Sequence, residues 1–131
     1  MADYGYIKIT TDEITLVEAD TLEFTLDELQ REASCDTINI VRCGHAVIPT
    51  APVMRSELLM CIDDNGKIVG KDINYVASLL YGNPMDCIVG DVVLGWTDPL
   101  DDVEPDIYKM PYTLAEKLYA TLRDAFTDKS E

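Results

Sequence analysis

Residues 61–74, CIDDNGKIVGKDIN, place carboxylates around an Asn-Gly pair and so resemble a calcium-binding loop. In an EF-hand loop the invariant glycine stands sixth, which would make Gly66 that glycine and Cys61 the first residue. A thiol cannot supply the hard oxygen ligand that calcium needs there, and Asp72 would replace the bidentate glutamate at position twelve. We therefore predict no metal and no cofactor. The pair Asn65-Gly66 instead predicts a tight hairpin turn, because both residues tolerate positive φ.

The single histidine, His45, lies two residues after Cys43, and a Cys-His pair can form a thiolate nucleophile. Gly44 lies between them and two prolines follow, which is typical of a strand end rather than of a rigid catalytic pair. The sequence contains no Walker A phosphate loop, no G-x-S-x-G and no H-E-x-x-H motif. Its four cysteines include no C-x-x-C pair of the kind that binds zinc. We predict that the protein is not an enzyme.

Acidic residues dominate the charged residues of the chain. The 131 residues include 25 Asp and Glu against 10 Lys and Arg, a formal net charge of -15. Such a field repels nucleic acid and anionic membranes and attracts basic partners. An acidic surface also keeps a protein soluble, and this plainer explanation stays open. The charge therefore favours a basic nucleic-acid-binding partner, with no direct binding to nucleic acid or to a membrane.

Several carboxylates have spacings similar to those between the phosphates of a nucleic acid. Glu18 and Asp20 would lie about 6.6 Å apart on one strand face, at roughly 3.3 Å per residue. Glu28 and Glu32 would share one face of a helix. An acidic, proline-containing stretch, DPLDDVEPD, adds Asp98, Asp101, Asp102, Glu104 and Asp106. These nine residues are the predicted partner-binding set.

Apolar periodicity and turn residues divide the chain into strands and helices. The predicted strands are residues 6–9, 14–18, 37–43, 57–63, 67–70 and 87–96. The predicted helices are residues 25–33, 72–82 and 111–126, and residues 44–56 form a loop. Capping boxes are expected at Thr25 with Glu28 and at Thr113 with Glu116, while Asp72 is the expected N-cap of the middle helix and Gly82 its expected end. The nearly continuous apolar run at residues 87–96 predicts a strand that is central or covered on both faces. The apolar stripes expected to face the core are Leu26, Leu29 and Ala33; Ile73, Val76, Ala77 and Leu80; and Leu114, Leu118, Leu122, Ala125 and Phe126.

This order of elements predicts an α+β fold, with a mainly antiparallel sheet of about five to six strands and three helices packed on it. Residues 1–131 form a single domain, with a core at residues 5–97, an acidic proline-rich loop at 98–112 and a C-terminal helix at 113–128. No stretch reaches the roughly 18 apolar residues of a membrane helix. The first residues also lack the pattern of a signal peptide, so we expect a cytoplasmic protein.

Three linked blocks resemble a known family. The family has a helix followed by a strand, with the pattern L-x-x-L-Q…Y-I-E-V-V, which resembles LDELQREASCDTINIVRC in this chain. Its next block is a strand, then Gly-Lys, then a helix that begins with Asn, which resembles CIDDNGKIVGKDINYVASLL. CIVGDVVLG resembles its closing strand, I-x-G-x-h-x-h-x-G with h for hydrophobic. The family is one of unknown function found in bacteria, bacteriophages and mobile elements, and the resemblance covers about residues 5–97. It implies the fold and a bacterial host cytoplasm as the setting, and it supplies no catalytic residues.

Charge and setting together favour an inhibitor of a host defence nuclease. A rigid carboxylate array can occupy the Lys- and Arg-lined groove that holds nucleic acid, and so act as a DNA mimic. The targets would be CRISPR effectors or restriction enzymes, which makes this an anti-CRISPR or anti-restriction protein.

Two alternatives remain open. One is a module that sequesters a small ligand or nucleotide, with a pocket at Asn74 and Asp91 and a basic lining from Arg42, Arg55, Lys67 and Lys71. The other is a protein-protein adaptor anchored by exposed aromatic residues, which are favoured at interfaces. The candidates are Tyr4, Tyr81, Trp96, Tyr108 and Tyr112.

Overall fold

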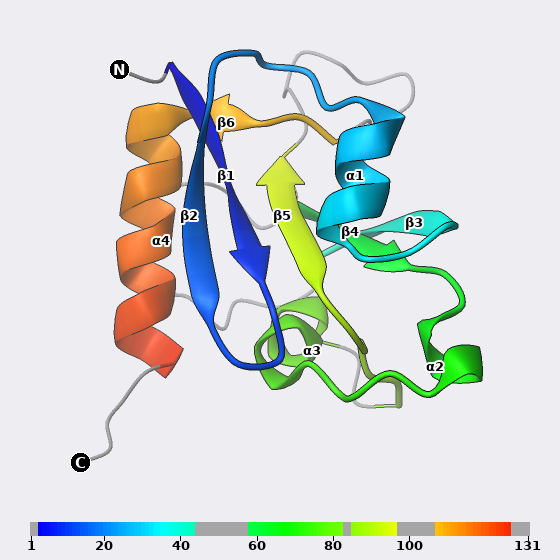
Figure 1. Cartoon of the computed structure of the whole chain (residues 1–131). Coiled ribbons are helices and arrows are strands. Elements are labelled where there is room, and N and C mark those ends of the chain that lie inside the picture. The colour runs from blue at the N-terminus through cyan, green and yellow to red at the C-terminus, as the bar shows by residue number, and fades with distance from the viewer. Residues whose placement is uncertain (1–2, 44–57, 83–84, 97–106, 127–131) are drawn as a thin grey trace.

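The computed structural model describes residues 3–43, 58–82, 85–96 and 107–126, which form one sheet with helices packed on both faces (Figure 1). In chain order the elements are β1 (Tyr4–Ile9), β2 (Ile14–Ala19), α1 (Leu26–Glu32), β3 (Ile38–Arg42), β4 (Leu58–Asp63), α2 (Gly66–Val69), α3 (Tyr75–Tyr81), β5 (Val92–Trp96), β6 (Met110–Pro111) and α4 (Tyr112–Phe126). Among these described residues, no helix is long and apolar enough to cross a membrane.

The sheet has six strands in the order β2-β1-β5-β4-β3, with β6 pairing with β1, and every pairing is antiparallel. This confirms the predicted α+β fold with a mainly antiparallel sheet, although the structure has four helices and not three. β5 lies between β1 and β4. Val92, Val93 and Leu94 of β5 are fully buried, as a continuous apolar run predicts for a central strand.

The two faces of the sheet carry separate cores, because alternate strand residues point to opposite faces. Ile7 and Ile9 of β1 pack with α3 and α4, whereas Tyr6 packs with α1. The predicted helix stripes are confirmed at Leu29, Ala33, Ala77, Leu80, Leu118 and Leu122, which are all buried. The prediction is wrong for Leu26, which is 59% exposed at the first residue of α1. Ile73 is also exposed, since it precedes α3, and the side chains of Ala125 and Phe126 lie outside the described residues.

Some of the predicted helix ends are confirmed and others are wrong. The predicted capping box of α1 is confirmed: the Glu28 amide donates to Thr25 Oγ1 at 3.0 Å, and the Thr25 amide donates to Glu28 Oε1 at 2.9 Å. Gly82 ends α3 with φ 77°, as predicted. The N-cap of α3 is Asn74 and not Asp72. The predicted second capping box is wrong, because α4 begins at Tyr112 and its Thr113 already lies inside the helix.

The predicted hairpin at Asn65-Gly66 is wrong, and the following residues form the helical turn α2. A type I′ turn needs positive φ at both residues, but Asn65 has φ -108°. The Asp63 carboxylate instead accepts a hydrogen bond from the Asn65 amide at 2.9 Å and turns the chain. Residues 67–70 could not have joined the sheet beside β4, because β3 and β5 already occupy its two edges.

Two predicted boundaries also move. The predicted strand at residues 87–96 is reduced to β5, which begins at Val92. The predicted loop at residues 98–112 ends inside the sheet, since Met110 is fully buried and β6 pairs with β1. The predicted loop at residues 44–56 lies outside the described residues.

Candidate binding site

The acidic residues predicted to bind a partner do not form one surface. Glu18 on β2 faces the side of α4, because it alternates with Ile14 and Leu16, which pack in the α4 core. Burial raises the pKa of the Tyr112 hydroxyl at the start of α4, and the carboxylates of Glu116 and Glu18 raise it further. Asp20 is exposed just beyond β2.

Glu28 and Glu32 lie on the opposite side of the sheet, on α1, and both are engaged within the molecule. Glu32 forms ion pairs with Lys8 at 3.5 Å and Arg31 at 3.4 Å. Glu28 pairs at 3.1 Å with Lys109, a side chain that is 2% exposed. Burial raises the pKa of Glu28, but hydrogen bonds from Thr25 and Lys109 outweigh it and the net shift is downward. These two carboxylates therefore stabilise the fold, and the acidic set at residues 98–106 lies outside the described residues.

Asn74 and Asp91, the two residues of the predicted ligand pocket, both make hydrogen bonds within the molecule. Asn74 is fully buried, and its amide nitrogen donates to the carbonyls of Ile9 and Gly90, at 2.9 Å each. Its side-chain oxygen accepts from the Ala77 amide at 3.1 Å, so its hydrogen bonds hold α3 against the sheet. Asp91 accepts a hydrogen bond from the Ser34 hydroxyl at 3.1 Å.

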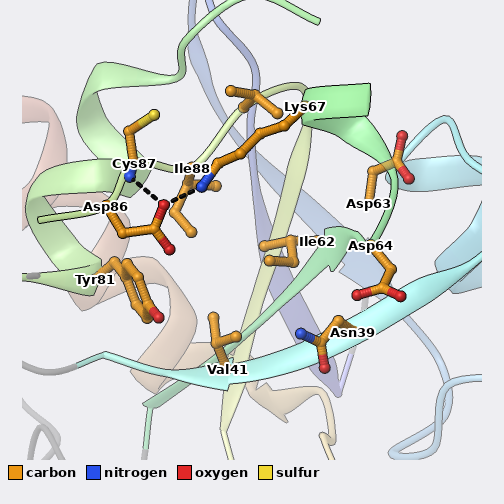
Figure 2. A pocket seen from close by; sticks show the side chains of 11 residues that line it. Asn39, Val41, Ile62, Asp63, Asp64, Lys67, Tyr81, Asp86, Cys87 and Ile88 are labelled. Atoms are coloured by element: carbon orange, nitrogen blue, oxygen red, sulfur yellow. Dashed lines mark hydrogen bonds and ion pairs between the residues drawn. The ribbon is translucent and has the colours of Figure 1, made fainter. Parts of the chain in front are cut away.

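A cavity of about 200 Å³ does lie between β3, β4, α2 and α3, and we refer to it as the acidic cavity (Figure 2). Figure 2 shows Asp86 and Tyr81 on one side and Asp64 and Asn39 on the other, with Ile62 and Val41 between them. The lining residues are Asn39, Val41, Ile62, Asp63, Asp64, Lys67, Tyr81, Asp86, Cys87, Ile88 and Val89. The cavity thus combines an apolar floor with a polar, mainly acidic rim.

Ion pairs decide which charges of this rim are available. Lys67 reaches from α2 to Asp86, and their hydrogen bond lowers the pKa of Asp86 and raises that of Lys67 (Figure 2). Asp63 is paired with Lys71 at 2.7 Å. Asp64 is exposed and has no ion pair within the described part of the chain. The cavity therefore favours a cation, and the engagement of both lysines argues against the nucleotide alternative.

A second cavity, of about 320 Å³, lies on the other face of the sheet, between α1 and β3. Its lining is mostly apolar: Glu23, Phe24, Leu29, Ile38, Ile40, Ile107 and Tyr108. We refer to it as the apolar cavity. β3 separates the two cavities, since Asn39 and Val41 line the acidic one while Ile38 and Ile40 line the apolar one.

Of the Cys-His pair considered as a nucleophile, the structure describes Cys43 alone. Cys43 is 4% exposed, and burial raises the pKa of its thiol to about 12, so a thiolate would be scarce at neutral pH. His45 lies outside the described residues. Within the described ranges no group of three or more His, Cys, Asp or Glu side chains is placed to hold a metal ion.

The aromatic anchors predicted for an adaptor are less exposed than expected. Tyr4, Tyr81, Trp96, Tyr108 and Tyr112 are all partly buried. Among the residues that the structure describes, the most exposed apolar side chains are instead Ile68, Tyr75 and Met85, which sequence reasoning did not single out. Ile68 belongs to the run at residues 67–70 that was predicted to be a strand, and it is exposed because that run forms α2 outside the sheet.

Comparison with family models, with curated proteins and with solved structures finds no match to this chain. The family resemblance drawn from the three sequence blocks therefore stays a prediction.

Proposed function

We propose that the protein is a non-enzymatic binding protein that presents its carboxylates to the basic surface of a partner, in place of nucleic-acid phosphates. The observation that carries the proposal is the excess of outward negative charge. The net charge is -15, and the ion pairs among the described residues involve four carboxylates, Glu28, Glu32, Asp63 and Asp86. Exposed carboxylates such as Glu18, Asp20 and Glu116 remain directed to solvent.

The partner we propose is a nuclease of host defence, a CRISPR effector or a restriction enzyme, in a bacterial cytoplasm. The groove of such an enzyme is lined with Lys and Arg and gains affinity by releasing counterions from the nucleic acid. A folded acidic surface of fixed shape can compete for the same side chains. The predicted resemblance to a family found in bacteria, bacteriophages and mobile elements supports this setting.

A pull-down from bacterial lysate tests the proposal. We expect the immobilised protein to retain a nucleic-acid-binding enzyme that high salt or excess duplex DNA displaces. A column that retains no such enzyme would reject the proposal, and so would retention that neither salt nor DNA reduces.

Charge-neutral variants then test which surface is used. The variant E18Q/D20N/E116Q alters the α4 side of β2, while the control D27N/D36N/D72N removes the same charge from other exposed positions. Three lost contacts of about 0.5 kcal/mol each should weaken partner binding roughly tenfold in the first variant. Titration calorimetry with the captured partner measures this loss. Equal losses in both variants would show that net charge acts without a defined surface.

A further inference from the structure

We propose that the outer edge of β3, which pairs with no other described strand, binds an extended segment of a basic partner protein as an added strand, with its alternate side chains entering the two flanking cavities. This inference rests on the proposed function, because it takes the partner to be basic. It adds a second contact with that partner, at the end of the sheet opposite β2 and the surface of Glu18, Asp20 and Glu116.

β3 ends the sheet, and its outer edge has no partner among the described strands. The Cys43 amide donates to the Leu58 carbonyl at 3.2 Å, and the Asp64 amide donates to the Thr37 carbonyl at 2.9 Å. In an antiparallel ladder, hydrogen-bonded positions alternate, so the odd-numbered residues of β3 bond to β4. Ile38 and Ile40 therefore direct their backbone N–H and C=O groups outward. Such an edge is a template for another strand.

The cavities on either side of β3 supply side-chain specificity to this edge. Residues of an added strand that lie opposite Ile38 and Ile40 would point to the apolar cavity. Residues opposite Asn39 and Val41 would point to the acidic cavity. Backbone hydrogen bonds with pockets for alternate side chains are the usual basis of strand addition.

The residues that line each cavity determine which side chains of the partner fit into it. An Arg or Lys entering the acidic cavity would lay its methylenes on Val41 and Ile62 and bring its charge to Asp64 and Asp86 (Figure 2). At about 200 Å³ this cavity is smaller than the roughly 300 Å³ lower bound of typical ligand pockets, which suits a single side chain. An aliphatic or aromatic residue would fit the apolar cavity. The recognised segment thus alternates basic and apolar residues, and the carboxylate rim disfavours a nucleic-acid strand at this edge.

Fluorescence anisotropy with three labelled seven-residue peptides tests the pattern. Isoleucine and arginine alternate in the first, the same residues stand in blocks in the second, and glutamine replaces arginine in the third. We expect the alternating basic peptide to bind at least about tenfold more tightly than either control. Equal binding of the first two would mean attraction by charge alone and would overturn the proposal, as would tighter binding of a labelled oligonucleotide.

Amide hydrogen exchange locates the binding edge. In the free protein the Ile38 and Ile40 amides should exchange fast and the Asn39 and Val41 amides slowly, because only the latter bond to β4. Addition of the alternating peptide should slow exchange at Ile38 and Ile40. Slow exchange there without peptide would show that the edge is already paired, and fast exchange with peptide bound would place the peptide elsewhere.

The exposed residue Asp64 gives a variant that leaves the fold intact. D64N should weaken binding of the arginine peptide about fivefold and leave the glutamine peptide unchanged, while the matched variant D72N should change neither. Equal effects on both peptides would remove Asp64 from the recognition of the cation. If the peptides fail but the lysate partner is still displaced by DNA, this inference fails and the proposed function stands. If the peptides bind but no such partner exists, the proposed function fails.

Discussion

Two lysine-carboxylate pairs, Lys109–Glu28 and Lys67–Asp86, have the same chemistry and opposite surroundings. Lys109 is 2% exposed; its ammonium also contacts the Thr21 hydroxyl at 3.1 Å and lies 5.2 Å from the centre of the Phe24 ring. Lys67 is 53% exposed, and Asp86 is 40% exposed, at the rim of the acidic cavity. Burial makes the first pair part of the fold, whereas water access leaves the second free to exchange partners.

The buried pair connects segments that are far apart in sequence. Lys109 lies beside β6, and its amide donates to the Leu22 carbonyl at 2.9 Å, while Glu28 is on α1. The pair therefore holds the segment leading into α1 against the segment leading into β6. Loss of either partner should affect the whole molecule, but unequally, because Glu28 can reach water and Lys109 cannot.

The largest effect is expected from E28Q. Glutamine can keep the capping box with Thr25 but leaves the buried ammonium of Lys109 without its counter-charge, so the free energy of unfolding should fall by about 2 kcal/mol. K109M should cost about 1 kcal/mol, because the Glu28 carboxylate can then be hydrated. Urea unfolding measures both. E28Q/K109M should be more stable than E28Q alone, and a double variant less stable than E28Q would contradict the asymmetry.

The pH dependence of stability provides the next test of the buried pair. The pKa of Glu28 is lowered in the folded protein from its ordinary 4.5, so the ionised form stabilises the fold. Its contribution is fully present above the unfolded pKa and is lost as the pH falls through the folded pKa. The difference in unfolding free energy between the native protein and E28Q should therefore be constant from pH 7 to about pH 5 and shrink below it. In the K109M background the difference should change less with pH. A difference that grows on acidification would contradict this linkage.

Sequence patterns predicted the parts of the fold that short-range physics determines. The capping box of α1, the glycine that ends α3 and the central position of β5 each depend on a local pattern, and each is confirmed. The hairpin at Asn65-Gly66 failed because strand pairing is decided by distant β3 and β5, which occupy both edges of β4.

Local sequence patterns could not predict the candidate site. The acidic cavity draws Asn39, Asp64, Tyr81 and Asp86 from separate elements, and no spacing in the sequence relates them. The same limitation explains Glu28 and Glu32. Their i, i+4 spacing correctly placed them on one helix, but Lys109 and Lys8, which engage them, come from remote segments.

The smallest effect on stability is expected at the exposed pair, Lys67–Asp86. There, a substitution should change peptide binding more than it changes stability. K67M should change the free energy of unfolding by less than about 0.5 kcal/mol, because an exposed ion pair contributes little. The same substitution frees the Asp86 carboxylate at the rim of the acidic cavity and removes a positive charge that competes with an incoming arginine. The affinity for the alternating arginine peptide should therefore rise, by about threefold, while that for the glutamine peptide stays constant. Anisotropy titration and urea unfolding of one sample separate the two effects. If K67M lost as much stability as E28Q, the exposed Lys67–Asp86 pair would also be structural, and the difference in exposure would not explain the roles of the two pairs.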